Sequence, residues 1–249
     1  MDKKFNFLGL NFHNVTFSEA EKKLECFIAE KKPHMVFMPN AELIVRAGKD
    51  SRLRKVYNDT HFLLVDSYVV YYAARLFRKP ISEPINGARL MFSFLDTINK
   101  KGYRIYLLGA EEKVLFQAIE NLKVKYPELK IAGRHHGYFD FDNDDMVVQS
   151  IRESKADVLF VAMSSPLKEN FVAKNLEKMD IPVCMGVGGS VDVIAGKCQM
   201  APLWVSKIGM EWFYRFIQDP RRLWKRYTFI NIKFLGLLMK EFLNGIFRN

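Results

Sequence analysis

Short apolar runs alternate along the chain with longer segments in which apolar residues recur at helical spacing. The runs show little alternation with polar residues, which is typical of strands buried on both faces of a parallel sheet. Predicted strands span 34–38, 62–65, 104–108, 157–162 and 183–187, with a weaker one at 130–132. Predicted helices span 17–31, 41–57, 67–77, 88–101, 111–126, 144–154 and 166–178.

This order of elements predicts an α/β fold, with a mainly parallel sheet and helices on both of its faces. Thr16 and Glu19 have the spacing of a capping box, which marks the start of the first helix. In sheets of this kind, ligands bind beyond the carboxyl ends of the strands. The residues directly after each apolar run are therefore the candidates for chemistry.

The segment from Asp219 onward predicts a basic amphipathic helix. Asp219 is a suitable N-cap, and Pro220 fits the first helical position. Lys233 and Lys240 interrupt the apolar residues, so no stretch approaches the ~18–20 uncharged residues that a bilayer-spanning helix needs. The apolar stripe comprises Leu223, Trp224, Tyr227, Ile230, Phe234, Leu235, Leu238 and Phe242. The basic side comprises Arg222, Lys225, Arg226, Lys233 and Lys240.

Two interpretations of this helix stay open. A cationic face opposite a Trp/Phe/Leu face is typical of a helix that lies in the headgroup layer of anionic lipid. The alternative is a C-terminal helix that packs on its own domain and leaves a basic face in solvent.

The charge of the chain is concentrated near its C-terminus. The net charge is +10, and residues 201–249 hold nine Lys and Arg against three acids, or +6. A nucleic-acid surface would spread the charge more evenly and carry a recognisable motif, so nucleic acid is not an expected partner. An anionic membrane or a diphosphate-bearing substrate fits better. The three cysteines, Cys26, Cys184 and Cys198, form no CxxC pair and indicate reduced thiols in a cytosolic protein.

Two polar residues follow predicted strands near the start of the chain. Asp66 comes directly after Val65 and opens a helix, so it is either an N-cap or a general base at the mouth of the sheet. Asn40 follows the strand that ends at Met38, and it either caps the next helix or binds a polar substrate.

Glycines mark two other strand ends. Gly109 begins a tight turn from strand to helix, a position that often accommodates a nucleotide. Gly186, Gly188 and Gly189 follow another strand, and their backbone amides are either a phosphate cradle or a structural turn. The run is not a dinucleotide fingerprint, because Val191 takes the third glycine position, nor is it a Walker A motif.

No metal site is predicted. Asp140 and Asp142 have the D-x-D spacing found in many nucleotide-sugar enzymes, but clustered acids at a helix N-terminus are the simpler and favoured explanation. His135 and His136 are adjacent, and on an extended chain they point to opposite faces.

In this order, the pieces resemble the WecG/TagA/CpsF family of bacterial glycosyltransferases over almost the whole chain. The two most specific segments are MGVGGSVDVIAGKCQMAP (185–202) and GMEWFYRFIQDPRRLWKRY (209–227). The others are MPNAELIVRA (38–47), LLVDSYVVYYAARL (63–76), INGARL (85–90), YLLGAEEKV (106–114), HHGYF (135–139) and SSPLKENFV (164–172).

The resemblance implies a Rossmann-like catalytic core over 1–200 and a membrane-associating appendage over 201–249. It also implies transfer of a hexosyl unit from a UDP-sugar to a polyprenyl-diphosphate-linked sugar, such as undecaprenyl-diphosphate-GlcNAc, on the inner face of the bacterial cell membrane. The products in the family are precursors of teichoic acid, enterobacterial common antigen or capsule. Asp66 matches the proposed base, Asn40 a substrate-site residue, and Arg215 and Arg222 the arginines thought to reach the diphosphate. No cofactor is implied, and self-association is left open.

Three positions depart from the family pattern. Met38 replaces a Thr, Pro84 replaces an Arg, and Lys168 replaces a Gln. The gained ammonium at Lys168 suits a carboxylated donor sugar or restores the charge lost at Pro84, so ManNAc, ManNAcA and other hexoses are all candidate donor units.

The favoured interpretation is an inverting transferase in which Asp66 is the base and Gly186–Gly189, Arg215 and Arg222 stabilise the departing diphosphate without a metal. Two alternatives are a non-catalytic membrane-associated scaffold on the same fold, consistent with the three departures, and a nucleotide-dependent oxidoreductase, which the broken glycine fingerprint disfavours.

Overall fold

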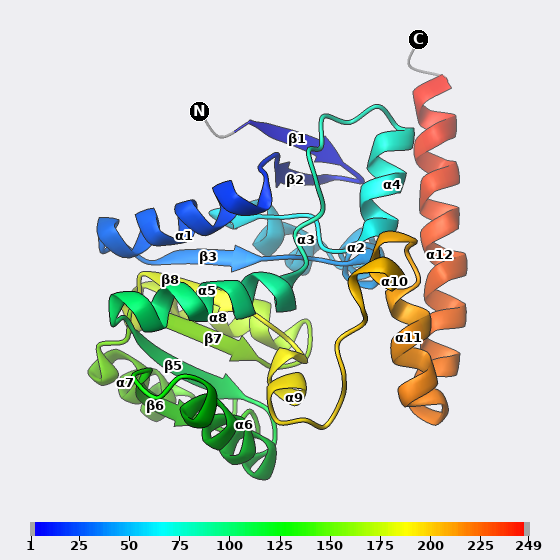
Figure 1. The fold of residues 1–249 in the computed structure, drawn as a ribbon. Coiled ribbons are helices and arrows are strands. Elements are labelled where there is room, and N and C mark those ends of the chain that lie inside the picture. Colours follow the sequence, from blue (N-terminus) through cyan, green and yellow to red (C-terminus); the bar gives the residue numbers. More distant parts are fainter. Residues whose placement is uncertain (1–2, 247–249) are drawn as a thin grey trace.

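A parallel six-stranded sheet forms the centre of the computed structural model, which describes residues 3–246 except the side chains of 222–228 and 244–246 (Figure 1). The strand order is β4-β3-β8-β7-β5-β6, and every neighbouring pair is parallel. The strands are β3 (His34–Phe37), β4 (Phe62–Leu63), β5 (Arg104–Gly109), β6 (Lys130–His135), β7 (Val158–Ala162) and β8 (Val183–Gly186). All six predicted strands are present, and the predicted α/β, Rossmann-like fold class is confirmed.

Alternate residues of the strands enter two separate hydrophobic clusters. Phe37 and Leu108 belong to one cluster, and Val36 and Leu107 belong to the other. Because successive side chains of a strand point to opposite faces, the clusters lie on the two faces of the sheet. The central strands are therefore buried on both sides, which explains the unbroken apolar runs in the sequence.

Helices cover both clusters. On the face of Val36 lie α1 (Phe17–Glu30), α5 (Gly87–Lys101) and α6 (Glu112–Lys125). On the face of Phe37 lie α2 (Ala41–Lys49), α3 (Ser51–Asn58), α4 (Tyr68–Leu76), α7 (Asp145–Ser154) and α8 (Leu167–Met179). Thr16 and Glu19 form both hydrogen bonds of the capping box at α1, as predicted.

The structure differs from the predicted elements in two places near the N-terminus. The helix predicted over 41–57 is two helices, because Asp50 has an extended backbone and its carboxylate caps α3. An antiparallel hairpin of β1 (Lys4–Phe7) and β2 (Leu10–His13) was not predicted. Its turn places Leu8 and Gly9 at positive φ, and its alternate phenylalanines join the cluster of Phe37.

The C-terminal part forms an appendage of helices beside the sheet (Figure 1). After α9 (Ser190–Ile194) come α10 (Leu203–Lys207), α11 (Glu211–Gln218) and the long α12 (Pro220–Ile246). The predicted start of the last helix at Pro220 is confirmed. Within residues 3–246, no helix is long and apolar enough to cross a membrane.

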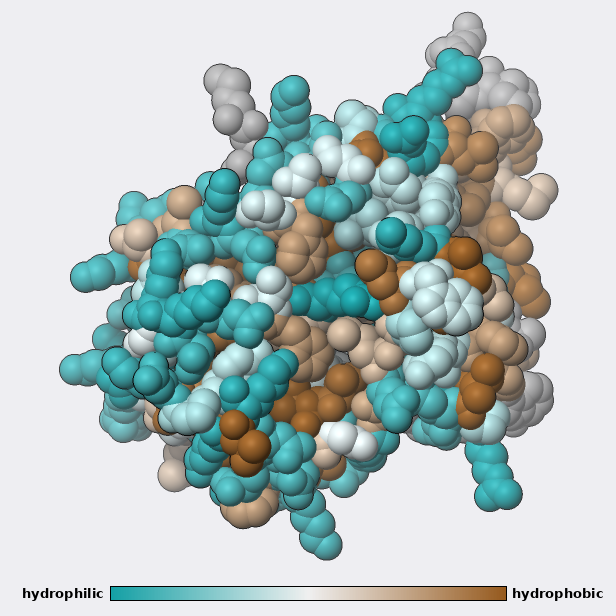
Figure 2. All heavy atoms as spheres, in the orientation of Figure 1, coloured by the Kyte–Doolittle hydropathy of each residue, from teal (hydrophilic) through white to brown (hydrophobic). Residues whose placement is uncertain are grey.

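Helix α12 has two apolar faces. Phe234 is buried in the cluster of Phe37, with Leu237 and Leu238 packed against it. Leu237 also lies against Gly48 of α2, 3.7 Å from where a Cβ would stand. A second set of large apolar side chains is exposed: Phe229, Ile232, Leu235, Met239, Phe242 and Leu243. Figure 2 shows brown, apolar side chains gathered on the side of the molecule that the appendage occupies.

Candidate functional site

Asn40 and Asp66 lie at the carboxyl ends of two adjacent strands. Strands β3 and β4 are parallel, with Phe37 opposite Leu63, so each residue comes three positions after a paired one. The carboxyl ends of parallel strands share one edge of the sheet, which is where ligands bind in this architecture.

Asp66 is not the N-cap residue of the helix that follows it. Ser67 is the N-cap residue of α4, and its side chain makes no capping hydrogen bond. Ser67 has φ 75°, a conformation that costs a non-glycine residue about 1–3 kcal/mol and is often found at functional sites. Asp66 instead accepts a hydrogen bond of 3.1 Å from the amide of Gly87, the first residue of α5. Capping of α4 therefore does not account for Asp66.

The surroundings of Asp66 favour its protonated form more than water does. Burial, followed by the negative charge of Glu211, raises the pKa of Asp66 to about 7. The positive charge of Arg215 and hydrogen bonds from the amides of Gly87 and Ser67 act in the opposite direction. A carboxylate with a pKa near 7 is suited to general base catalysis at neutral pH, because it is a stronger base than an ordinary aspartate.

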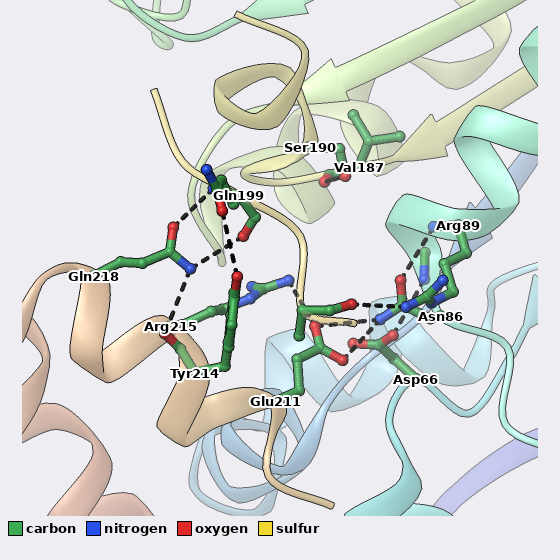
Figure 3. A network of polar contacts seen from close by, with 12 residues as sticks. Asp66, Asn86, Arg89, Val187, Ser190, Gln199, Glu211, Tyr214, Arg215 and Gln218 are labelled. Carbon is green, nitrogen blue, oxygen red and sulfur yellow. Dashed lines mark hydrogen bonds and ion pairs between the residues drawn. The ribbon is translucent and has the colours of Figure 1, made fainter. Parts of the chain in front are cut away.

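The INGARL turn at the start of α5 connects Asp66 to the appendage (Figure 3). Asn86 is the N-cap of α5, and its oxygen accepts a hydrogen bond from the Arg89 amide. Its Nδ2 donates to both carboxylate oxygens of Glu211, at 3.2 and 3.4 Å. Glu211 in turn accepts from Arg215 at 2.8 Å. The structure thus brings Arg215, a residue named from the sequence, to the strand edge that holds Asp66.

Further hydrogen bonds fasten the appendage to the core. Arg89 Nη2 donates to the carbonyl of Ala201 at 2.8 Å, just before α10. Gln199 and Gln218 exchange two hydrogen bonds, which join the loop after α9 to the end of α11. The appendage therefore forms one wall of the site.

Asn86 and Glu211 are functional candidates that the residue-by-residue reading did not single out. Both lie within segments that carried the family resemblance, INGARL and GMEWFYRFIQDPRRLWKRY. The family resemblance therefore marked both segments, but nothing in the sequence of either one indicates that they meet in the fold.

The substituted residue Met38 lies beside the same turn. Its Sδ and Cε stand 3.4 Å from where a Cβ on Gly87 would be placed. Asn40, two residues later, accepts a hydrogen bond of 3.2 Å from the Leu43 amide and so caps α2. The capping role of Asn40 is present, and its predicted substrate contact stays a prediction.

Two backbone amides of the glycine run after β8 donate hydrogen bonds within the protein. The amides of Val187 and Gly188 both donate to the carbonyl of Val161, at 3.0 and 3.3 Å. A Cβ on Gly186 would come within 2.6 Å of the Phe37 ring, whereas Gly188 is at φ 51°. These contacts explain the glycines at 186 and 188 through packing and backbone conformation. The phosphate-cradle role of Gly186, Gly188 and Gly189 stays a prediction.

The backbone at position 109 requires a glycine. It has φ 122°, and a Cβ there would fall 2.4 Å from the carbonyl oxygen of Ala162. A cavity of about 460 Å³ near the following turn is lined by Glu111, Glu112, His136 and Tyr138. In the strand order, β5 is separated from β8 by β7, so Gly109 lies two strands from the glycine run.

Lys168 lies under the glycine run in a buried polar cluster. Its Cε stands 3.2 Å from the Cβ position of Gly186. Its Nζ donates to Glu169 at 2.5 Å, and Glu169 also accepts from the hydroxyl of Tyr57 at 2.8 Å. The ammonium is therefore at the predicted edge of the sheet, with its charge paired to a buried carboxylate.

The acidic run before α7 is organised by local contacts. The Asp142 amide donates to the Asp140 carboxylate at 3.0 Å, and Asp144 is buried between Lys174 and Asn175. Within the described side chains, no group of three or more His, Cys, Asp or Glu could hold a metal ion. The side chain of Arg222 lies outside the described residues.

Comparison with known proteins shows the family of the chain. The model of the glycosyl transferase WecG/TagA/CpsF family matches residues 5–247. A protein of Staphylococcus aureus strain MW2, named N-acetylglucosaminyldiphosphoundecaprenol N-acetyl-beta-D-mannosaminyltransferase, is 31% identical over 222 residues, or 88% of this chain and 87% of the relative. Proteins of the same name from strains NCTC 8325 and MRSA252 show the same identity and coverage. Because the family model covers nearly the whole chain, the protein belongs to the WecG/TagA/CpsF family of glycosyl transferases.

Proposed function

We propose that the enzyme transfers an N-acetylmannosaminyl or closely related hexosyl unit from a UDP-sugar to GlcNAc-diphospho-undecaprenol. The names of its relatives specify this acceptor and N-acetylmannosamine. The observation that carries the proposal is Asp66, a carboxylate with a pKa of about 7 at the carboxyl edge of the sheet, next to an arginine of the appendage.

The proposed reaction is a single displacement with inversion. Asp66 takes the proton of an acceptor hydroxyl, whose oxygen attacks the anomeric carbon of the donor. The bond from that carbon to the UDP oxygen breaks, and its electron pair leaves with UDP. Arg215, and Arg222 beyond it on α12, balance the charge that develops on a diphosphate.

The appendage is suited to bind the enzyme to a membrane surface. The exposed apolar side chains of α12 lie on the same helix as Lys233 and Lys240, a combination suited to an anionic lipid surface. We propose peripheral binding to the inner face of the bacterial membrane, where a lipid-linked acceptor is reached by diffusion in two dimensions. The product would be a precursor of a cell-surface polysaccharide.

The paired ammonium of Lys168 bears on the choice of donor. A neutral sugar such as ManNAc needs no cation, and Glu169 already neutralises Lys168 in this structure. A carboxylated donor would have to compete with Glu169 for the ammonium. A panel of UDP-sugars with a short-chain prenyl-diphosphate-GlcNAc, analysed by product mass, distinguishes the two.

Replacement of Asp66 by Asn tests the proposed base. Loss of a positioned general base typically lowers the rate ~10²–10⁴-fold. We expect that loss in kcat for Asp66→Asn, with UDP binding and thermal stability nearly unchanged. Asp180→Asn is the matched control, because Asp180 is exposed at the C-terminal end of α8. Retention of more than half of the wild-type kcat in Asp66→Asn would falsify the base assignment.

A further inference from the structure

Two carboxylates meet the same turn of the backbone from different parts of the chain. Asp66 accepts from the amide of Gly87, and Glu211 accepts from the side chain of the preceding residue, Asn86. Figure 3 shows Asp66 and Glu211 directed toward this turn from the core and from α11. One turn therefore holds the candidate base and an acid of the appendage together.

An ordinary structural role explains only part of Glu211. It is the first residue of α11, where an acid interacts favourably with the helix dipole, and Arg215 is four residues later. However, its side chain is only 16% exposed, and its contact with Asn86 spans 125 residues of sequence. A surface acid that only stabilised α11 would have no need of a partly buried contact with the N-cap residue of α5.

We propose that Glu211 is a positioning residue for the transfer reaction, holding Asn86 and Arg215 around Asp66 and keeping a negative charge beside the base. This inference rests on the proposed function of Asp66. It assigns the appendage a part in the chemistry that is separate from contact with the membrane or the diphosphate.

The two side-chain charges that act on Asp66 both come from α11. From α11, Glu211 raises the pKa of Asp66 and Arg215 lowers it. From α5, the guanidinium of Arg89 is directed to the carbonyl of Ala201. From α4, burial raises the pKa of Tyr68, so its hydroxyl stays neutral at pH 7. Glu211 is thus the acid that opposes Arg215 at this edge.

The sign of the expected pH effect follows from these charges. Asp66 must be unprotonated to accept a proton, so kcat/KM falls as the pH drops through the pKa of Asp66. Removal of the negative charge of Glu211 lowers that pKa and moves the acidic limb to lower pH. Removal of the positive charge of Arg215 raises the pKa and moves the limb to higher pH.

The test compares Glu211→Gln with Arg215→Gln in the full-length enzyme. Glutamine keeps an oxygen that can accept from Asn86 but has no charge. We expect the acidic limb of kcat/KM to move by ~1 pH unit downward in Glu211→Gln and upward in Arg215→Gln. Glu241→Gln, which removes a carboxylate from α12, leaves the limb in place. Glu211→Asp, which restores the charge, returns the limb toward its wild-type position.

A second readout does not depend on turnover. Carbon-13 NMR titration of the free protein gives the pKa of the Asp66 carboxyl, assigned by its absence from Asp66→Asn. The same opposite shifts are expected there. A purely structural role would lower the activity of both variants without moving the pKa in opposite directions.

The outcomes separate this inference from the function on which it rests. Retention of more than half of the wild-type kcat in Asp66→Asn overturns the proposed base, and the role of Glu211 with it. Loss of turnover in Asp66→Asn, together with an unmoved limb and an unmoved NMR titration in Glu211→Gln, overturns the inference alone.

Discussion

Helices α5 and α12 are both long and amphipathic, but only α5 hides its apolar side. The apolar side of α5 is buried against the sheet, and its buried residues are Ala88, Leu90, Met91, Phe94, Leu95 and Ile98. Among the described side chains of α12, Phe234 alone is fully buried, and six large apolar residues are exposed. The two helices share a period in sequence and differ in what covers them.

The difference shows that an amphipathic pattern does not by itself decide what the apolar side of a helix contacts. Phe234 and Leu237 pack on the core, so α12 is in part the packed C-terminal helix that was one of the two interpretations of the sequence. Leu235 and Phe242 lie on the exposed part, and Trp204 of α10 is also exposed. Soluble proteins rarely expose a large contiguous apolar patch unless it binds something. This patch supports the proposal of lipid contact.

The largest effect is expected from removal of the exposed apolar face. A variant with Gln at Ile232, Leu235, Met239 and Phe242 should lose sedimentation with phosphatidylglycerol vesicles. At ~1.5 kcal/mol for each side chain withdrawn from lipid, the affinity for vesicles should fall by more than ~10³-fold. Its unfolding midpoint should stay near that of the wild type, because these side chains are exposed. Unchanged vesicle binding would remove the lipid interpretation of the patch.

A second test uses two phenylalanines of the same helix. Phe234→Ala should destabilise the protein by ~3–5 kcal/mol in urea unfolding, because it leaves a cavity against the core. Phe242→Ala is the matched control, 61% exposed, and should change the stability little while weakening vesicle binding. Equal effects of the two substitutions on stability would contradict the packing of α12 on α2.

A smaller effect is expected from the basic residues. Lys233→Glu combined with Lys240→Glu should weaken vesicle binding at least ~30-fold, at ~1 kcal/mol for each cation lost near an anionic surface. Turnover on a water-soluble acceptor should be unaffected. The same reversal at Lys32 and Lys113, exposed lysines of the core, is the control. If added salt does not weaken wild-type binding, electrostatic attraction has no part in it.

The smallest effect is expected from chelation. Asp144 is held by Lys174 and Asn175, and Asp140 by a local turn, so these acids have structural partners. We expect EDTA to leave kcat within about twofold of its untreated value, with arginines in place of a metal at the diphosphate. Loss of turnover that Mn²⁺ or Mg²⁺ restores would reassign Asp140 and Asp142.

The sequence by itself determined the layered fold and the place of Asp66. Strands buried on both faces leave uninterrupted apolar runs, and a cap such as Thr16 with Glu19 is complete within four residues. Asp66 could be selected because it directly follows such a run. These features depend on neighbours in sequence, so they can be read without the fold.

Only the tertiary structure decided what surrounds Asp66. The contact between Asn86 and Glu211 joins residues 125 positions apart, and no local period encodes it. Likewise, the amides of Val187 and Gly188 donate hydrogen bonds to the carbonyl of Val161 on a neighbouring strand. From the glycine spacing alone, the amides of this segment could equally have been free to bind a phosphate. Hydrogen-bond partners and the pKa of a carboxyl depend on which distant groups packing brings within a few ångströms. For that reason, the sequence predicted Asp66 as the base, and the contact between Asn86 and Glu211 decided what surrounds its carboxyl.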